Sequence, residues 1–266
     1  MVLGNPRDVL DRPAPPPDFT LRYGDHPDQV ADVRRPANDG AGAHLVIFIH
    51  GGFWRAAFDR HHVGPLASDL AERGYAVATI EYRRVGQPGG GWPGTFSDVA
   101  AAVAAVPDLL AKELAHRGLP AVDIDRPVLA GHSAGGQLAL WYAAVAPDAV
   151  RGVLGLAPVA DLITGHRLGI GDEAVASLLG GSPAARPEIY ASADPMAHLP
   201  LNVPTVIVHG AEDDRVPIEL SRQYAQAARR AGDDTTLVEL AGVEHFALID
   251  PLSAAWPAVL DSLRSL

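Results

Sequence analysis

Apolar runs of strand length alternate along the chain with longer segments of helical periodicity. The run at 45–49, Leu-Val-Ile-Phe-Ile, is continuously apolar, as expected for a parallel strand covered on both faces. Further strands are predicted at 75–80, 126–130, 150–156, 205–209 and 235–240, and helices at 61–73, 100–116, 136–144, 218–231 and 251–266. This alternation predicts a mainly parallel central sheet with helices on both faces.

Three segments depart from the alternation. Residues 18–35 are predicted to supply antiparallel edge strands. Pro107 is expected to kink or split the helix that Ser97 and Asp98 can cap. Residues 162–200 are rich in glycine and proline and hold one predicted helical piece at 173–179. Because most connections in such folds run about 2–6 residues, we expect this insertion to form a small lid over the site.

Length and composition narrow the class of protein. The 266 residues suffice for one domain, predicted over 19–266, after a proline-rich arm at 1–18 that is flexible or wrapped on the surface. The arm has no basic start and no apolar centre, and no apolar run approaches the ~20 residues of a membrane span, so we expect a cytoplasmic protein. A homodimer is left open.

Charge and residue usage exclude several partners. Lys and Arg total 21 against 32 Asp and Glu, and the resulting net charge of -11 argues against nucleic acid and anionic membranes. The absence of cysteine excludes disulfides and cysteine nucleophiles. The 11 histidines show no spacing to carboxylates that indicates a metal site.

A serine motif lies between a predicted strand and a predicted helix. Gly131-His132-Ser133-Ala134-Gly135 fits the pattern G-x-S-x-G, after the strand at 126–130 and before the helix at 136–144. Strand, tight turn and helix together expose a serine hydroxyl as a nucleophile, and the flanking glycines permit so sharp a turn. We therefore predict Ser133 as the nucleophile.

A base and an acid follow in the order that such a serine requires. Asp213 lies in the turn after the strand at 205–209, and His245 lies in the loop after the strand at 235–240. Both loops leave the carboxyl ends of strands, where ligands bind in open α/β sheets. An acidic loop or a single histidine is usually solvated surface. The prediction of a triad therefore depends on the order of the three residues along the chain, which is serine, acid and then histidine. Asp214 is the second candidate for the acid and Glu212 the third.

A glycine-rich loop offers donors for an oxyanion. His50-Gly51-Gly52-Phe53-Trp54 follows the strand at 45–49 directly. The expected donors are the backbone N–H groups of Gly52, Phe53 and Ala134. The candidates for the pocket wall are Trp54, His132 and Phe246. Trp54 suits the core equally well, His132 suits a packing role, and His209 is expected to be structural.

These motifs resemble those of the α/β-hydrolase superfamily from about residue 21 to the end of the chain. His50-Gly51-Gly52-Phe53-Trp54 and Gly131-His132-Ser133-Ala134-Gly135-Gly136 resemble the kynurenine formamidases (arylformamidases) and their esterase relatives. The hormone-sensitive-lipase branch usually has aspartate in place of His132 and glycine in place of Phe53. The acid turn, with Val216-Pro217 behind it, resembles the superfamily's and selects Asp213 over Asp214.

The resemblance implies an α/β-hydrolase fold and a serine hydrolase without a cofactor. The substrate would be a small-molecule ester of a short acyl group or an aryl formamide, cleaved through Ser133, His245 and Asp213. A general short-chain carboxylesterase, similar to feruloyl or acetyl esterases, is the alternative. A ligand receptor that keeps the hydrolase scaffold without turnover is the alternative from another class of protein.

Overall fold

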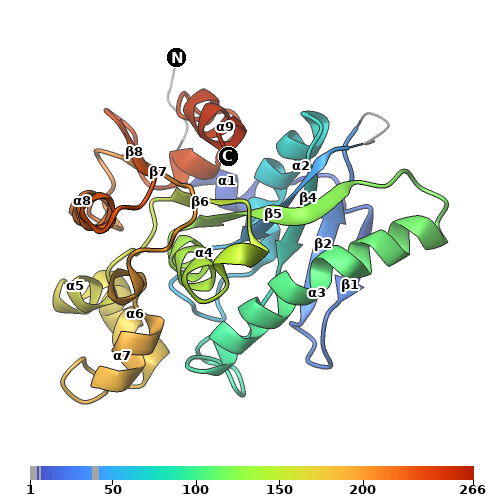
Figure 1. The fold of residues 1–266 in the computed structure, drawn as a ribbon. Helices are drawn as coiled ribbons and strands as arrows, with labels where there is room; N and C mark the ends of the chain where they lie inside the picture. The colour runs from blue at the N-terminus through green and yellow to red at the C-terminus, as the bar shows by residue number, and fades with distance from the viewer. Residues whose placement is uncertain (1–4, 6, 38–41) are drawn as a thin grey trace.

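The structure is a computed structural model that describes residues 5, 7–37 and 42–266. Its centre is an eight-stranded sheet in the order β1-β2-β4-β3-β5-β6-β7-β8 (Figure 1). The strands are β1 Phe19–Arg22, β2 Val30–Arg34, β3 His44–Ile49, β4 Ala76–Ile80, β5 Asp123–His132, β6 Gly152–Leu156, β7 Thr205–Gly210 and β8 Thr235–Leu240. β1 and β2 pair antiparallel, β2 pairs antiparallel with β4, and the other pairs are parallel, which confirms the predicted sheet and its edge strands.

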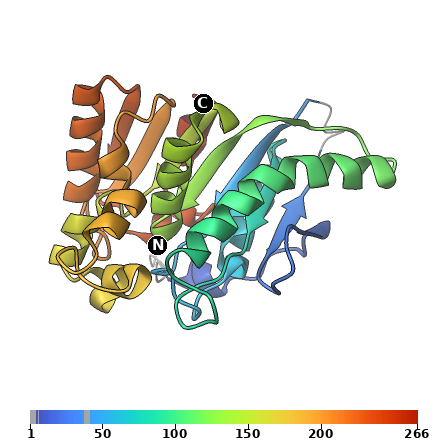
Figure 2. The same ribbon diagram turned by 60° about the horizontal axis from the view of Figure 1, so that its bottom comes forward.

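Helices cover both faces of the sheet (Figures 1 and 2). One face carries α1 Asp8–Asp11, α2 Gly64–Glu72 and α9 Trp256–Arg264, and the other carries α3 Gly94–His116, α4 Ala134–Val145 and α8 Glu219–Ala231. Alternate side chains of β3 enter the two cores: Val46 and Phe48 pack with α2 and α9, and Ile47 and Ile49 pack with α3 and α4. This two-sided burial explains why β3 is apolar at consecutive positions.

Of the kink or split expected at Pro107, the split is wrong. α3 runs without interruption from Gly94 to His116 and begins three residues before Ser97. Proline removes one helical hydrogen bond, but the buried face of α3 holds both halves on the sheet, through Val103 before the proline and Leu110 and Leu114 after it. By length and hydropathy alone α3 could cross a membrane, although it packs on the sheet as a core helix does.

The C-terminal helix is shorter than predicted. A 3-10 turn, η4 Phe246–Ile249, precedes an irregular stretch, and α9 begins only at Trp256. The helix predicted at 61–73 likewise opens with a 3-10 turn, η1 Arg60–Val63, before α2. A further 3-10 turn, η2 Pro147–Ala149, joins α4 to β6.

The insertion at 162–200 holds more helix than its single predicted piece. It forms α5 Leu162–Arg167, α6 Ile170–Leu179, α7 Pro187–Ala193 and the 3-10 turn η3 Pro195–His198. The Asp161 side chain caps α5 by accepting a hydrogen bond from the Thr164 N–H at 2.7 Å. The Arg55 guanidinium donates to the Asp172 carbonyl at 2.8 Å, so the insertion contacts the loop that follows β3.

The described part of the N-terminal arm lies against the body of the protein. Val9 of α1 is fully buried in the core beneath α2. Arg12 forms an ion pair with Asp250, with Nη2 at 2.9 Å from Oδ2. Residues 1–4 and 6 of the predicted arm lie outside the described residues. From residue 7 onward the arm is therefore wrapped on the surface.

Candidate active site

Ser133 occupies a strained turn between β5 and α4. Its backbone has φ 56° and ψ -118°, outside the regions that a residue with a side chain normally adopts. The turn is close-packed: a Cβ at Gly131 would lie 2.3 Å from the Gly135 carbonyl oxygen, and one at Gly135 would lie 2.1 Å from that of Ile49. Only glycine fits at these two positions, and the predicted strand–turn–helix context of the serine is confirmed.

Asp213 and His245 meet at the carboxyl ends of the neighbouring strands β7 and β8. His245 Nδ1 lies 2.6 Å from Asp213 Oδ2, and both side chains are buried. The other carboxylate oxygen, Oδ1, accepts from the backbone N–H groups of Arg215 and Val216 at 2.8 Å each. The aspartate is thus fixed on one side by its own turn and contacts the imidazole on the other.

Asp213 also contacts a second histidine. His209 Nε2 lies 3.3 Å from Asp213 Oδ2 and 2.9 Å from the Val216 carbonyl oxygen. Burial alone would raise the pKa of Asp213, but the hydrogen bonds from His209 and His245 outweigh it and hold the pKa well below its usual value. The carboxylate is therefore charged at neutral pH and able to orient His245 and stabilise its protonated form.

The other two acids in this turn do not reach the site. The Asp214 side chain is 69% exposed and pairs with Arg215, and Glu212 is exposed. The structure brings Asp213 alone of the three to His245.

A narrow cavity joins Ser133 and His245. This serine cavity has a volume of about 40 Å³, and its wall also includes Gly52, Phe53, His132 and Phe246. Arg7 and Leu10 of the arm, Phe58, His62 and Arg215 complete its lining. Within the described chain, the Ser133 hydroxyl makes no hydrogen bond of ordinary geometry to the His245 ring; such contacts are often long before a substrate binds.

Two of the three candidate wall residues line the serine cavity. Phe246 and His132 do so, and His132 Nε2 also donates to the His245 carbonyl oxygen at 3.2 Å. Burial, together with the nearby His245, lowers the pKa of His132 well below its usual value, so its ring is neutral. Trp54 is fully buried in the core instead, where its indole N–H donates to Gln137 Oε1 at 3.2 Å.

The loop after β3 bends sharply toward the serine turn. Gly52, Phe53 and Trp54 all have positive φ, at 111°, 53° and 56°. A Cβ at Gly52 would lie 2.3 Å from the Phe58 Cβ, so this position requires glycine. Across the described residues, the backbone N–H groups of Gly52, Phe53 and Ala134 have no hydrogen-bond partner.

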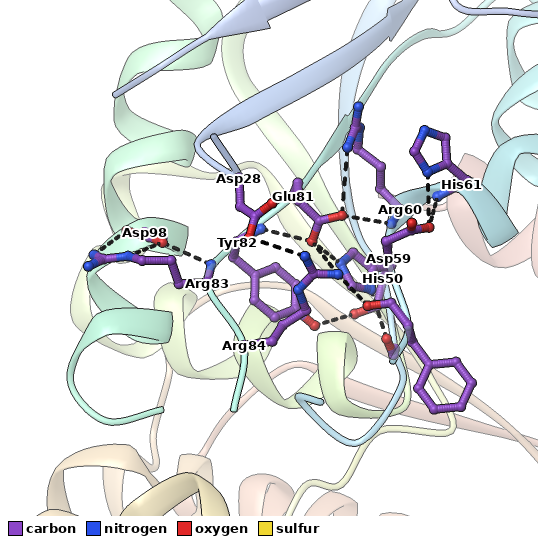
Figure 3. Close-up of polar contacts among 12 residues, drawn as sticks. Asp28, His50, Asp59, Arg60, His61, Glu81, Tyr82, Arg83, Arg84 and Asp98 are labelled. Carbon is purple, nitrogen blue, oxygen red and sulfur yellow. Dashed lines mark hydrogen bonds and ion pairs between the residues drawn. The ribbon is translucent and has the colours of Figure 1, made fainter. Parts of the chain in front are cut away.

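A buried acid that the sequence analysis missed stands behind this loop. Glu81 is 1% exposed, and its Oε1 lies 2.7 Å from His50 Nε2 (Figure 3). Burial would raise the pKa of Glu81, but His50, Arg84 and backbone donors outweigh it and keep the pKa below its usual value. The register of β3 and β4 pairs Ile49 with Ile80, so His50 and Glu81 each follow the end of a paired strand. Glu81 directly follows the strand predicted at 75–80, but its pairing with His50 depends on which strands are neighbours and has no signal in the local sequence.

No group of three His, Cys, Asp or Glu side chains in the described ranges is arranged to hold a metal ion. A separate set of groups gathers at the serine cavity. It comprises a hydroxyl on a strained turn, a carboxylate–imidazole pair and a set of unpaired backbone donors.

The strand order, the serine turn and the placement of the acid and histidine after β7 and β8 define an α/β-hydrolase fold. The chain belongs to the BD-FAE family, whose model matches residues 31–227.

Curated relatives and solved structures agree with this placement. Esterase LipC of Mycobacterium tuberculosis is 29% identical over 248 residues, covering 86% of this chain and 59% of its own. A probable isoprenylcysteine alpha-carbonyl methylesterase of Arabidopsis thaliana, ICMEL1, is 25% identical and covers 88% of this chain and 52% of its own. The chain thus spans between half and three fifths of the length of these relatives.

Two solved structures share the fold. The thermophilic esterase Est2 of Thermogutta terrifontis, with butyrate bound, has a TM-score of 0.69 at 22% identity and covers 93% of this chain and 92% of its own. A truncated carbohydrate esterase from gut microbiota has a TM-score of 0.75 at 18% identity, covering 94% and 99%.

Proposed function

We propose that this protein is a serine carboxylesterase that cleaves esters of short acyl groups. The observation that carries the proposal is the Asp213–His245 pair, which faces the same narrow cavity as the strained Ser133. The names of its relatives, which include esterases and a methylesterase, support hydrolysis of a carboxylic ester. They support this general activity better than the formamidase reaction that the H-G-G-x-W sequence at 50–54 suggests.

The proposed reaction proceeds through an acyl-enzyme. His245 takes the proton of the Ser133 hydroxyl as its oxygen attacks the ester carbonyl, and Asp213 stabilises the resulting imidazolium. The carbonyl oxygen, now an oxyanion, is bound by the N–H groups of Gly52, Phe53 and Ala134. His245 then protonates the leaving alcohol, and a water activated by the same histidine releases the acid.

The serine assignment is tested by Ser133→Ala. We expect turnover of p-nitrophenyl acetate and its initial burst to fall by about 10⁴-fold or more, because the nucleophile is lost. The circular dichroism spectrum and melting temperature should match those of the parent, because alanine fits the turn as well as serine does. Retained turnover in the folded variant would refute the assignment.

An aryl formamidase is the second candidate function. The H-G-G-x-W sequence at 50–54 favours it, and so does the cavity volume of about 40 Å³. This volume is far below the roughly 300–1,000 Å³ that is typical of ligand sites. A formyl group has no carbon beyond its carbonyl and is the smallest acyl group that the cavity could take.

A substrate panel separates the two candidates. We expect kcat/KM to decrease from p-nitrophenyl acetate to propionate to butyrate, because each added methylene must enter the narrow cavity. N-formylkynurenine turned over faster than acetate esters would establish the formamidase. Good turnover of butyrate with no reaction of the formamide would establish a general esterase. Tight binding of these compounds without any product over hours would indicate a receptor.

We also propose that residues 162–200 act as a lid. A Cβ at Gly171 would lie 2.3 Å from the Phe53 ring, so the insertion packs directly on the loop that carries the proposed oxyanion donors. The contacts of Arg55 with the Gly171 and Asp172 carbonyls fix the same junction. A lid in this position would shield the oxyanion from water.

A further inference from the structure

A second, larger cleft lies against the serine cavity. Its volume is about 710 Å³, within the range of about 300–1,000 Å³ that is typical of ligand sites. The arm forms one wall, and η1 with the edge of the sheet forms the other. The cleft and the serine cavity share four lining residues, which are Arg7, Leu10, Phe58 and His62. A molecule bound in the cleft would therefore extend toward Ser133.

This cleft, which we call the arm cleft, is lined by buried polar groups without partners. In the described chain these groups are Arg34 Nε, Thr79 Oγ1 and His62 Nδ1. Arg34 is 8% exposed and Thr79 is 2% exposed. Arg34 Nη2 donates to the Pro15 carbonyl at 2.8 Å, but no carboxylate among the described residues forms an ion pair with this guanidinium.

Two other arginines of the arm cleft already have carboxylate partners. Arg60 binds Asp32 at 2.7 Å, and Arg12 binds Asp250. His62 is neutral near pH 7 because burial and the nearby His50 lower its pKa to about 4. Among the described residues, Arg34 is thus a buried charge without a carboxylate in ion-pair contact, and Asp32 and Asp18 act on it only from farther away. A buried guanidinium is costly unless it is paired, and its planar fork matches a carboxylate.

We propose that the arm cleft binds a carboxylate-bearing part of the substrate, with Arg34 as its counter-ion and the Thr79 hydroxyl as a second donor. The proposal rests on the proposed esterase activity and specifies the class of ester: one whose alcohol or acyl part ends in a carboxylate.

Direct binding tests the site without reference to catalysis. Calorimetric titration with benzoate should give saturable binding to the parent protein, at least tenfold weaker binding to Arg34→Gln, and little binding of the neutral analogue benzamide. Arg73→Gln removes a positive charge from an exposed pair with Asp69 on α2 and should leave benzoate binding unchanged. Equal affinity in Arg34→Gln, or no saturable binding of benzoate by the parent, would show that the cleft holds water only.

Kinetics then test whether this site serves the reaction. We expect the ratio of kcat/KM for 4-acetoxybenzoate over 4-acetoxybenzamide to fall about tenfold in Arg34→Gln and to stay unchanged in Arg73→Gln. An unchanged ratio would overturn the substrate role. Benzoate binding by a protein that hydrolyses no ester would refute the esterase and leave the anion site standing. If Arg34→Gln does not fold, Thr79→Val is the second variant, with about threefold weaker benzoate binding expected.

A separate set of contacts, those of Glu81, carries a second inference. His50 Nδ1 donates to the Gly51 carbonyl oxygen at 2.7 Å, and its Nε2 faces Glu81 (Figure 3). Both ring nitrogens of His50 thus face oxygen atoms that can accept a hydrogen bond. Glu81 is in turn held by the Arg60 and Tyr82 backbone N–H groups at 3.0 and 3.1 Å.

Because His50 holds the Gly51 carbonyl, it also fixes the direction of the Gly52 N–H, which is a proposed oxyanion donor. The Gly51 carbonyl and the Gly52 N–H belong to one planar trans peptide and point in opposite directions. Glycine on both sides leaves that peptide free to rotate unless something holds it. We infer that His50 and Glu81 are positioning residues, which hold the Gly51–Gly52 peptide so that its N–H faces the oxyanion. This inference also rests on the proposed esterase.

The test compares binding of the transition state with binding of the substrate. A trifluoromethyl ketone adds to the serine and forms a stable oxyanion, so its inhibition constant reports on the donors. In His50→Phe, which keeps the ring stacked on Tyr82, we expect a 100-fold loss in kcat/KM and a parallel rise in the inhibition constant, with KM changed less than threefold. Glu81→Gln should lose less than tenfold, because an amide still pairs with His50.

A buried acid elsewhere in the same region gives the matched control. Asp98 is 1% exposed and binds Arg83, without contact to His50 (Figure 3). Asp98→Asn should lower the melting temperature but leave the inhibition constant within twofold. Folded His50→Phe with kcat/KM within twofold of the parent would overturn the inference. If His50→Phe does not fold, the same comparison on Glu81→Leu decides it, with losses in kcat/KM and ketone affinity expected in parallel.

Discussion

At the scale of single residues, the two neighbouring acids Asp213 and Asp214 give a sharp comparison. Asp213→Asn should lower kcat by about 10²–10⁴-fold, because the amide cannot stabilise the His245 imidazolium and favours the wrong tautomer. Asp214→Asn, at a side chain that is 69% exposed, should change kcat less than threefold. Steady-state kinetics on p-nitrophenyl acetate check both variants, and the reverse ranking would place the acid one residue later.

The places of Ser133, Asp213 and His245 in the fold could be predicted because local sequence sets the surroundings of these proposed triad residues. Ser133 has its glycines, and Asp213 and His245 directly follow strands that are readable from their apolar runs. Glu81 and Arg34 could not be predicted in this way. The side chains that contact Glu81 and Arg34 depend on which strands are neighbours in the sheet. The periodicity of apolar residues within a segment does not predict that strand order.

At the scale of elements, Asp194 ties parts of the insertion together. Its carboxylate caps η3 through the Met196 N–H and accepts from the Ile163 N–H of α5, both at 3.2 Å. Burial, with Asp161 nearby, raises the pKa of this carboxyl to about 6. The native state then holds this proton more tightly than the unfolded state does. Ionisation of Asp194 therefore lowers the free energy of unfolding as the pH rises from about 4 to about 6.

The sign of this effect gives a prediction for Asp194→Asn. A rise in pKa from about 3.8 to about 6 corresponds to about 3 kcal/mol. We therefore expect the free energy of unfolding of the variant to increase relative to that of the parent, by up to about 3 kcal/mol, between pH 4 and pH 7. Urea denaturation at several pH values measures this difference. A difference that is independent of pH would show that Asp194 does not titrate in this range.

The errors in the elements share one physical cause. Pro107 and the Ser97–Asp98 cap are local signals, and in both places tertiary contacts prevail. The Asp98 carboxylate accepts hydrogen bonds from Arg83 and Gln29 instead of capping a helix. Similarly, the insertion forms short helices whose stability comes from packing on the body, which periodicity in so short a segment does not reveal.

At the scale of the whole molecule, the arm connects distant parts of the chain. The ion pair of Arg12 with Asp250 joins the N-terminal segment to the turn before α9. Asp250→Asn should release the arm, because the neutral amide cannot balance a partly buried guanidinium. We expect trypsin to cleave after Arg7 at least threefold faster in this variant, as followed by mass spectrometry.

The control for this experiment is Asp261→Asn, which removes a charge from an exposed pair with Arg264 on α9. Its cleavage rate after Arg7 should match that of the parent. Equal rates in Asp250→Asn would mean that burial of Val9 alone holds the arm. The overall class of fold could be predicted from alternating apolar runs, but this attachment could not, because it joins residues more than 200 positions apart.

The two ends of the described chain also differ in what lies beside them. Arg7 and Leu10 line the cavity of Ser133, whereas Leu266 packs near Gly152, at the amino end of β6 and away from the serine. A purification tag at the amino end is joined to the same segment as Arg7 and Leu10, whereas a tag after residue 266 is not. Rate constants for this protein are therefore best measured with the tag placed after residue 266 or cleaved off before assay.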